Sequence, residues 1–425
     1  MQIGFEAGLV AVGLLLIGAA AASGLSNRTI LSLAVLSVLA GMGLELAGVL
    51  EVEPGAKSII LIVEVVLLLT LFSDGLLVEQ GLLRHHWQAP ARALVIAMPL
   101  NAAFVAVMAK LLFGDLSWTE AFLVGFILSP TDPVVTSSVV ASPKVPPLVR
   151  HTLNLESGVN DGLALPFVLL FLALSAGEGA DLIGEGGDLA IESVIGLAAG
   201  AAVALLAGKL LDVLPDWAII PRYEGLFALG LGLASFGVAE LIGGNGLIAA
   251  FVAGVVLAIV RHELPDVFHG FNENVSNVLQ IVAFALFGAL VVETSFDGGV
   301  LALMGFVAFA LFAARPASVL LAFVGVRLRR PEKLFIAWFG PKGIASMLFA
   351  LFALNSSAPE RTLVFDLAAF TILASIIAHG LTDTVAASWI ERRLERRDGG
   401  EERSTPGIRG STIQTHIPTE IDPKS

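Results

Sequence analysis

The sequence contains no cysteine, which excludes disulfides, thiolate metal sites and cysteine nucleophiles. Charge is also scarce, because 14% of the 425 residues are charged, whereas a soluble domain carries about 25%. Hydrophobic residues make up 56% of the chain, and the mean hydropathy is +0.88. This composition indicates an all-α polytopic membrane protein.

Apolar segments recur along most of the chain. A helix needs roughly 20 mostly apolar residues to span the hydrocarbon, and hydropathy with breaker residues predicts about thirteen transmembrane helices. They lie near residues 4–23, 30–49, 58–74, 93–113, 119–141, 151–175, 188–208, 221–242, 245–260, 272–293, 299–326, 334–354 and 362–388. Residues 1–390 are therefore assigned to a transmembrane domain. Residues 391–425, which are polar, are assigned to a disordered cytoplasmic tail.

Basic residues predict the orientation, because cytoplasmic loops retain Lys and Arg. Most of them, including Arg150 and Arg327, fall on one side of the predicted bundle. The opposite loops hold only Lys57, Lys110 and Arg361. We expect a multi-pass protein of the cell membrane, surrounded by lipid, with its N-terminus outside and its tail in the cytoplasm. The net charge of −13 says little about partners, and no nucleic-acid partner is expected.

Five charged residues stand out inside the predicted segments. A charge at mid-bilayer costs at least about 2.5 to 3.5 kcal/mol on insertion scales, so each is a functional candidate. They are Asp132, Glu156, Asp161, Arg315 and Lys342. At 1.5 Å rise per residue, all except Glu156 are placed roughly 12 to 24 Å from the entry surface. These four charges are therefore expected in the middle third of the membrane.

Two segments are interrupted near these charges. In LSPTDPVV, residues 128–135, Pro130 and Pro133 remove backbone donors and push the preceding residues out of helical angles. In WFGPKGIASM, residues 338–347, glycine and proline surround Lys342. The first interruption alone is also compatible with a proline kink. Because the interrupted segments are the fifth and twelfth, they cross in opposite directions, and paired interruptions of this kind indicate a transporter's binding site.

Half-helices that end inside the membrane leave uncompensated backbone dipoles. We expect Asp132 to offset a positive helix N-terminus and Lys342 to compensate the dipoles of the second interruption. Irregular backbone at this depth is tolerated only where protein or a water-filled cavity satisfies its polar groups. The two interruptions are therefore expected to lie in the interior of the bundle.

The stretch LESGVNDGLALP, residues 155–166, contains Glu156 and Asp161, the other two acidic residues of these five. Glu156 and Asn160 share a helix face, and Asp161 is turned by a further 100°. Arg315 stays protonated and needs an anion, so we expect a structural ion pair with Glu156. Asp161 is then left without a committed counter-ion. A carboxylate of this kind in a partly desolvated cavity binds protons and cations in competition.

Five blocks of sequence carry a resemblance. They are SPTDPVV (129–135), LESGVNDG (155–162), GGNGLIAAFVAG (243–254), ARPASVL (314–320) and GPKGIAS (340–346). The sequence resembles the NhaP and NHE-type sodium/proton antiporters of the monovalent cation:proton antiporter-1 family. The resemblance implies an NhaA/NhaP-like fold, with inverted repeats and two crossing broken helices. It also implies secondary active exchange of a monovalent cation, Na+ with Li+ or K+ left open, for H+ by alternating access, with no cofactor and no enzymatic activity.

The resemblance assigns roles to individual residues. Asp161 would be the carboxylate that exchanges the cation for the proton, and Asn160 before it is typical of the electroneutral one-for-one branch. Thr131, Asp132 and Ser157 would help to hold the cation, with Asp132 and Asp161 as its carboxylate ligands.

The resemblance also implies an assembly, and one residue departs from the family's pattern. Family members are usually homodimers, with a moving core, here about residues 93–175 and 299–388, and a dimerisation scaffold from the rest. For GGNGLIAAFVAG, close packing of small residues is favoured over ligand contact.

Lys342 stands where many relatives have arginine. Because lysine can lose its proton when buried, strict electroneutrality stays open.

Three alternatives remain at this stage. A K+/H+ antiporter would use the same residues. A cation channel could be built from the same carboxylates and helix ends, although twin broken helices favour alternating access. An intramembrane aspartyl protease would use Asp132 and Asp161 as a pair sharing one proton. Neither aspartate lies in a Gly-x-Gly-Asp sequence, and the segments contain no Ser/His arrangement.

Overall fold

The computed structural model describes most of the chain. The described residues are 10, 13–18, 21, 33–49, 57–76, 87–132, 142, 144–177, 184–213, 224–260, 266–294, 296 and 299–401. Within these ranges every regular element is a helix, as the composition predicts. The predicted segment 4–23 is therefore described only at a few positions, and Pro133 with the rest of 133–141 lies outside the described residues.

The helices follow the predicted segments closely. In the first half of the chain they are α2 (Leu33–Leu46), α3 (Lys57–Leu76), α5 (Gln88–Arg92), η1 (Ala93–Ala97), α6 (Met98–Leu112), α7 (Trp118–Ile127), α9 (Pro147–Ala176) and α10 (Gly184–Val213). In the second half they are α11 (Glu224–Leu241), α12 (Gly246–Val260), α13 (Asp266–Val292), α14 (Val300–Phe309), η4 (Ala310–Ala314), α15 (Arg315–Ala322), α16 (Arg330–Trp338), α17 (Ile344–Leu354) and α18 (Arg361–Glu401).

Six helices in the described ranges are long and apolar enough to cross a membrane. They are Ile59–Leu76, Gln88–Leu112, Pro147–Ala176, Ala190–Val213, Val300–Ala322 and Arg361–Asp383. Several further apolar helices are shorter, among them α7, which ends at the first interruption, and α17, which begins after the second. The many membrane crossings are thus confirmed, whereas the predicted number of thirteen is not established.

The helices that precede the two interruptions share a distortion. The π-helical segment η1 ends two residues before Pro99, and η4 ends two residues before Pro316. A proline ring clashes with the carbonyl four residues earlier, and a wider π turn relieves that clash. The same local device therefore stands before each broken segment, as expected for a repeated architecture.

Small residues bring several helices to close approach. A Cβ added to Gly254 of α12 would collide with the Phe72 carbonyl of α3, and one added to Gly41 of α2 would collide with the Ala285 carbonyl of α13. Gly246 faces the ring of Phe236 in the same tight manner. The GGNGLIAAFVAG block thus packs helices, in agreement with its predicted role.

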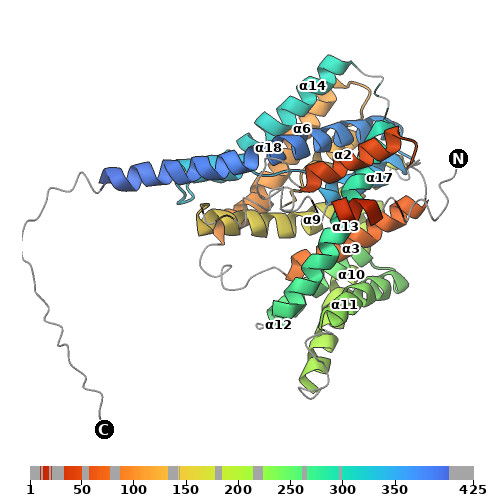
Figure 1. The fold of residues 1–425 in the computed structure, drawn as a ribbon. Coiled ribbons are helices and arrows are strands. Elements are labelled where there is room, and N and C mark those ends of the chain that lie inside the picture. The colour runs from red at the N-terminus through yellow and green to blue at the C-terminus, as the bar shows by residue number, and fades with distance from the viewer. Residues whose placement is uncertain are drawn as a thin grey trace, which may run out of the picture.

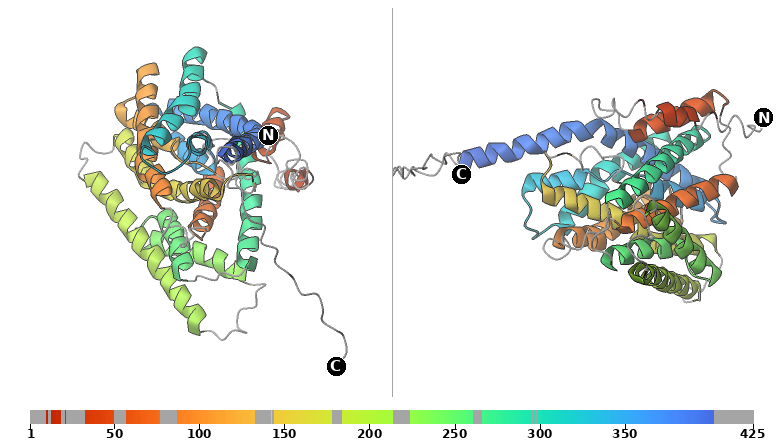
Figure 2. Two further views of the ribbon diagram at one scale, coloured as in Figure 1. Left: turned by 90° about the vertical axis from the view of Figure 1, so that its left-hand side faces the viewer. Right: turned by 60° about the horizontal axis from the view of Figure 1, so that its bottom comes forward.

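Two groups of helices can be distinguished in the views. Helices α10, α11 and α12 gather on one side of the molecule, and α6, α14 and α18 lie on the other (Figure 1). A second view shows α10 running along the margin, away from α14 (Figure 2). Helix α3 contacts α12 of the first group, and it also contacts α9 and α17. It therefore connects the first group to the helices near the two interruptions.

Helix α18 is longer than the predicted segment 362–388, because it continues to Glu401 and projects beyond the bundle (Figure 1). The expected boundary at residue 391 is therefore not a helix end. The stretch ERRLERRD (391–398) consists mainly of good helix formers, and the first breakers are Gly399 and Gly400. Residues 402–425 of the predicted tail lie outside the described residues.

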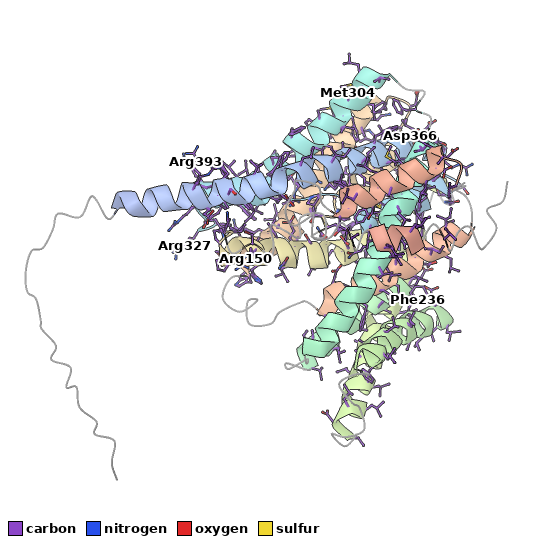
Figure 3. All side chains as sticks on the ribbon, in the orientation of Figure 1. Arg150, Phe236, Met304, Arg327, Asp366 and Arg393 are labelled. Carbon is purple, nitrogen blue, oxygen red and sulfur yellow. The ribbon has the colours of Figure 1, made fainter. Side chains whose placement is uncertain are left out.

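Labelled arginines cluster at one end of the bundle. Arg150, Arg327 and Arg393 all lie toward the end from which α18 projects, whereas Asp366 lies toward the opposite end (Figure 3). The three arginines belong to the set assigned to the cytoplasmic side by sequence. Their common location agrees with that grouping.

Candidate functional site

The two interruptions meet each other in the interior. The Asp132 N–H donates to the Pro341 carbonyl at 2.9 Å, and the Ile344 N–H donates to Asp132 Oδ2 at 3.3 Å. Lys342 Nζ donates to the Pro130 carbonyl at 3.3 Å. Asp132 thus accepts from the N-terminus of α17, and Lys342 serves a carbonyl just beyond the end of α7. Each interruption compensates the dipoles of the other.

Two glycines are required for this crossing. A Cβ on Gly343 would collide with the carboxylate of Asp132, and a Cβ on Gly340 would collide with the guanidinium of Arg315. Both neighbours are buried and lack room to move away. The glycines of GPKG therefore admit the two charged groups into the break.

Helix α9 presents polar side chains to the first interruption. Asn160 Nδ2 donates to Thr131 Oγ1 at 2.7 Å, and Thr131 Oγ1 lies 3.2 Å from Ser157 Oγ. All three residues are buried. The amide of Asn160 therefore orients the Thr131 hydroxyl, and two hydroxyl oxygens are held side by side. The structure thus brings together Thr131, Ser157 and Asn160, three of the polar residues predicted from these two blocks.

Arg315 lies against Glu156, with 2.8 Å between Nη1 and Oε1. Its Nη2 donates to the Phe339 carbonyl at 3.0 Å, just past the end of α16. Both charged side chains are buried, with 7% and 4% exposed. One guanidinium thus joins α15, α9 and the end of α16, which matches a structural ion pair.

Asp161 lies one residue beyond Asn160 and is buried. Among the described residues, its Oδ1 has no hydrogen-bond partner. The charged groups that act on it are Asp74, Asp132 and Lys342. Two of these are carboxylates, so Asp161 lies within electrostatic reach of two further acidic groups and has an oxygen without a hydrogen-bond partner among the described residues.

Asp74 on α3 was missed by sequence reasoning. It is buried, and a Cβ at Gly158 of α9 would lie 3.5 Å from the Asp74 carbonyl oxygen. Its charge acts on both Asp132 and Asp161. Asp74 is the last residue of the predicted segment 58–74, and an acidic residue at that position is typical of the end of a membrane helix. Its inclusion in a mostly apolar segment was the signal that the sequence offered.

Ser375 and His379 on α18 were also missed, although a histidine inside an apolar segment is itself unusual. The Lys342 N–H donates to Ser375 Oγ at 2.9 Å, and His379 Nε2 lies 2.9 Å from the Trp338 carbonyl. Both residues are buried. They therefore contact the second interruption from the side of α18.

In the part of the chain that the structure describes, no three acidic or histidine side chains are arranged to hold a metal ion together. Hard monovalent cations are bound by oxygen ligands whose number and field strength set selectivity. Ser157 lies one helical turn before Asp161 on α9, and its hydroxyl lies 3.2 Å from that of Thr131. This set suits a singly charged cation with few carboxylate ligands.

Comparisons with known sequences give a family match and several relatives. A family model described as "Sodium/hydrogen exchanger, transmembrane" matches residues 12–389. The chain is 25% identical over 351 residues to "K(+)/H(+) antiporter NhaP" of Alkalimonas amylolytica, covering 80% of this chain and 59% of that protein. It is 28% identical over 313 residues to "K(+)/H(+) antiporter NhaP2" of Shewanella oneidensis, covering 71% and 52%. The chain spans little more than half the length of these curated relatives.

A yeast relative and a solved structure are also similar. "Na(+)/H(+) antiporter 2" of Zygosaccharomyces rouxii is 26% identical over 386 residues, covering 78% of this chain and 45% of that protein. The structure of the sodium proton antiporter MjNhaP1 from Methanocaldococcus jannaschii matches with a TM-score of 0.72 at 19% identity, covering 91% of this chain and 98% of that one. At this identity the structural match establishes the fold.

Proposed function

This chain belongs to the sodium/hydrogen exchanger family, and on that premise we propose that it exchanges a monovalent alkali cation for a proton across the cell membrane. The family consists of transporters rather than enzymes, so the protease alternative is set aside. The proposal covers the activity, the substrates and the assembly. It is supported by the match over residues 12–389 and by the geometry around Asp161.

The open carboxylate of Asp161 is the observation that carries the proposal. A single carboxylate holds either one proton or one monovalent cation, and each must leave before the other binds. Asp161 has an unpartnered oxygen and acidic neighbours, so it is suited to this competition. Glu156, by contrast, is committed to Arg315.

The cation ligands are proposed to come from the crossing, with α9, and from α3. Asp161, Asp132, Thr131 and Ser157 belong to the core that crosses at the interruptions, and Asp74 belongs to α3, which also packs on α12. Movement of the core relative to α3 would change which side of the membrane reaches the site. This arrangement supports alternating access with a moving core of about residues 93–175 and 299–388.

The assembly and orientation follow the same proposal. We place the protein in the cell membrane as a homodimer, in contact with lipid, with the N-terminus outside and the tail in the cytoplasm. The arginines gathered at the end from which α18 projects support the orientation (Figure 3). No cofactor and no nucleic acid take part in the proposed cycle.

Sodium is proposed as the transported cation, and potassium is a second candidate because two similar proteins are described as K(+)/H(+) antiporters. The test is proton flux in proteoliposomes that contain the purified chain, with Na+, Li+ or K+ added outside. We expect flux with at least one cation and no stimulation by an imposed voltage, as in one-for-one exchange. Cation flux without reciprocal proton movement would show a channel and overturn the proposal, and stimulation by voltage would exclude strict electroneutrality.

A further inference from the structure

The second interruption is bridged by one turn of α18. Two backbone groups of the break lack helical partners, because α16 ends at Trp338 and α17 begins at Ile344. The Lys342 N–H donates to Ser375 Oγ at 2.9 Å, and the Trp338 carbonyl lies 2.9 Å from His379 Nε2. Ser375 and His379 lie four residues apart on one face of α18. One turn of α18 therefore spans both sides of the break.

The ring of His379 contacts backbone groups on both of its sides. The Trp338 carbonyl can only accept, so His379 Nε2 donates to it. On the other side of the ring, Nδ1 lies 2.8 Å from the Ser375 carbonyl oxygen and 3.2 Å from Ser375 Oγ. Ser375 Oγ accepts from the Lys342 N–H. The ring and the hydroxyl therefore each hold one end of the break.

Aromatic packing keeps the ring in place. The indole of Trp338 stacks on His379 with 5.0 Å between ring centroids and an interplanar angle of 28°. Trp338 Nε1 donates to Thr382 Oγ1 at 3.1 Å, one turn further along α18. The end of α16 is thus attached to α18 by both its carbonyl and its side chain. The bridge has a defined geometry rather than a single contact.

Two hydrogen bonds connect the residues held by this bridge to the proposed cation site. Lys342, whose amide is held by Ser375, places its Nζ on the Pro130 carbonyl of the first interruption. Two residues later, the Ile344 N–H reaches the carboxylate of Asp132. Displacement of the Lys342 peptide would therefore shift two of the three hydrogen bonds described between the interruptions, those to the Pro130 carbonyl and to the Asp132 carboxylate.

We propose that Ser375 and His379 are positioning residues for the cation site, which hold the second interruption on α18 so that Lys342 and Ile344 keep Asp132 in its binding geometry. Helix α18 holds the second interruption through Ser375 and His379. In the same way, α9 contacts the first interruption through Ser157 and Asn160. Neither Ser375 nor His379 contacts the cation. This inference rests on the proposed exchange activity, and its test separates the two.

The test uses four variants of the full chain in proteoliposomes. His379→Leu removes both ring nitrogens, and Ser375→Ala removes the hydroxyl at almost unchanged volume. His379→Gln keeps a side-chain N–H for Trp338. The matched control is Thr371→Val, because the buried Thr371 hydroxyl lies one turn earlier on α18 and bonds only the Leu367 carbonyl of its own helix. Cation KM, maximal rate and cation-induced thermal stabilisation are measured for each.

His379→Leu and Ser375→Ala are expected to raise the cation KM roughly tenfold, the order associated with a buried group left without its hydrogen bond. The cation concentration needed for thermal stabilisation should rise in parallel. His379→Gln should restore most of the affinity, and Thr371→Val should match the native chain. A purely structural role would lower the amount of folded protein and the maximal rate while KM stayed unchanged.

The inference is overturned if KM in Ser375→Ala stays within about twofold of the native value, a change below that expected for one lost hydrogen bond, or if Thr371→Val raises KM equally. If His379→Leu does not fold, Ser375→Ala against Thr371→Val decides the question alone. A native chain that exchanges no cation would instead refute the proposed function. In that case, cation-induced thermal stabilisation still reports whether the bridge positions a binding site.

Discussion

Asp161 and Glu156 lie five residues apart on α9, and their neighbours give them different tasks. Glu156 accepts from a guanidinium that also holds the end of α16. Among the described residues, Asp161 has an oxygen without a hydrogen-bond partner, and the charges of Asp74 and Asp132 act on it. The chemical character of each residue is therefore decided by what its side chain meets. Two predictions follow at the scale of single side chains.

Asp161→Asn is expected to abolish cation and proton exchange while the protein stays folded. Asparagine has nearly the same volume, but it cannot bind a proton and a cation in turn. The measurement is sodium or potassium uptake driven by a pH gradient, with thermal stability measured in parallel. Asp115→Asn, in an exposed turn, serves as the control and should exchange normally. Uptake that persists in Asp161→Asn would contradict the assigned role.

Arg315→Ala is expected to destabilise the protein by about 3 to 5 kcal/mol, because Glu156 is left as a buried, unpaired charge. The melting temperature in detergent measures the loss. Replacing the exposed Arg361 by alanine should have little effect. The double variant Glu156→Leu, Arg315→Leu should recover much of the stability, because no uncompensated charge remains. Equal stability of Arg315→Ala and the native chain would show that the pair is not a clamp.

At the scale of elements, the two interrupted helices form one unit. The contacts between them are reciprocal, because Asp132 serves the N-terminus of α17 and Lys342 serves a carbonyl beyond α7. Neither interruption could satisfy its own backbone groups in a hydrocarbon environment. The break in one helix therefore requires the break in the other.

Gly343→Ala is expected to disrupt this unit, because the added Cβ would collide with the Asp132 carboxylate. We expect a large loss of exchange together with lower thermal stability. The control is Gly305→Ala on α14, where a Cβ would meet nothing within 4 Å. That change should leave exchange intact and can add about 0.5 to 1 kcal/mol of stability, because alanine favours the helix. An active Gly343→Ala variant would refute the crossing geometry.

At the scale of the whole molecule, proton and cation are expected to compete for the same carboxylate. As the pH falls into the range where Asp161 holds a proton, the apparent KM for the cation should rise about tenfold per pH unit, by mass action of one proton. At saturating cation the maximal rate should change little. Initial rates in proteoliposomes at several pH values measure this dependence. A KM independent of pH would indicate separate binding sites.

The sequence predicted the membrane helices and some of the site residues, but not every helix end. The apolar segments and the charges within them were readable, since transfer of a charge into lipid is costly wherever it occurs. The motif blocks placed Thr131, Asp132, Ser157 and Asn160 in one neighbourhood. The helix end near residue 390 was misplaced, because a polar helix can continue into water without an apolar face to mark it.

Sequence alone determined that this chain is a bundle of membrane helices with two interruptions and a few charged residues in its interior, because burial costs and proline geometry act locally. Only the tertiary structure decided which groups meet. Lys342 and Pro130 are separated by 212 residues, and Arg315 and Glu156 by 159. Asp74 and His379 entered the site region because α3 and α18 pack against the crossing. Packing between distant helices depends on the shapes of both partners, which no single segment carries.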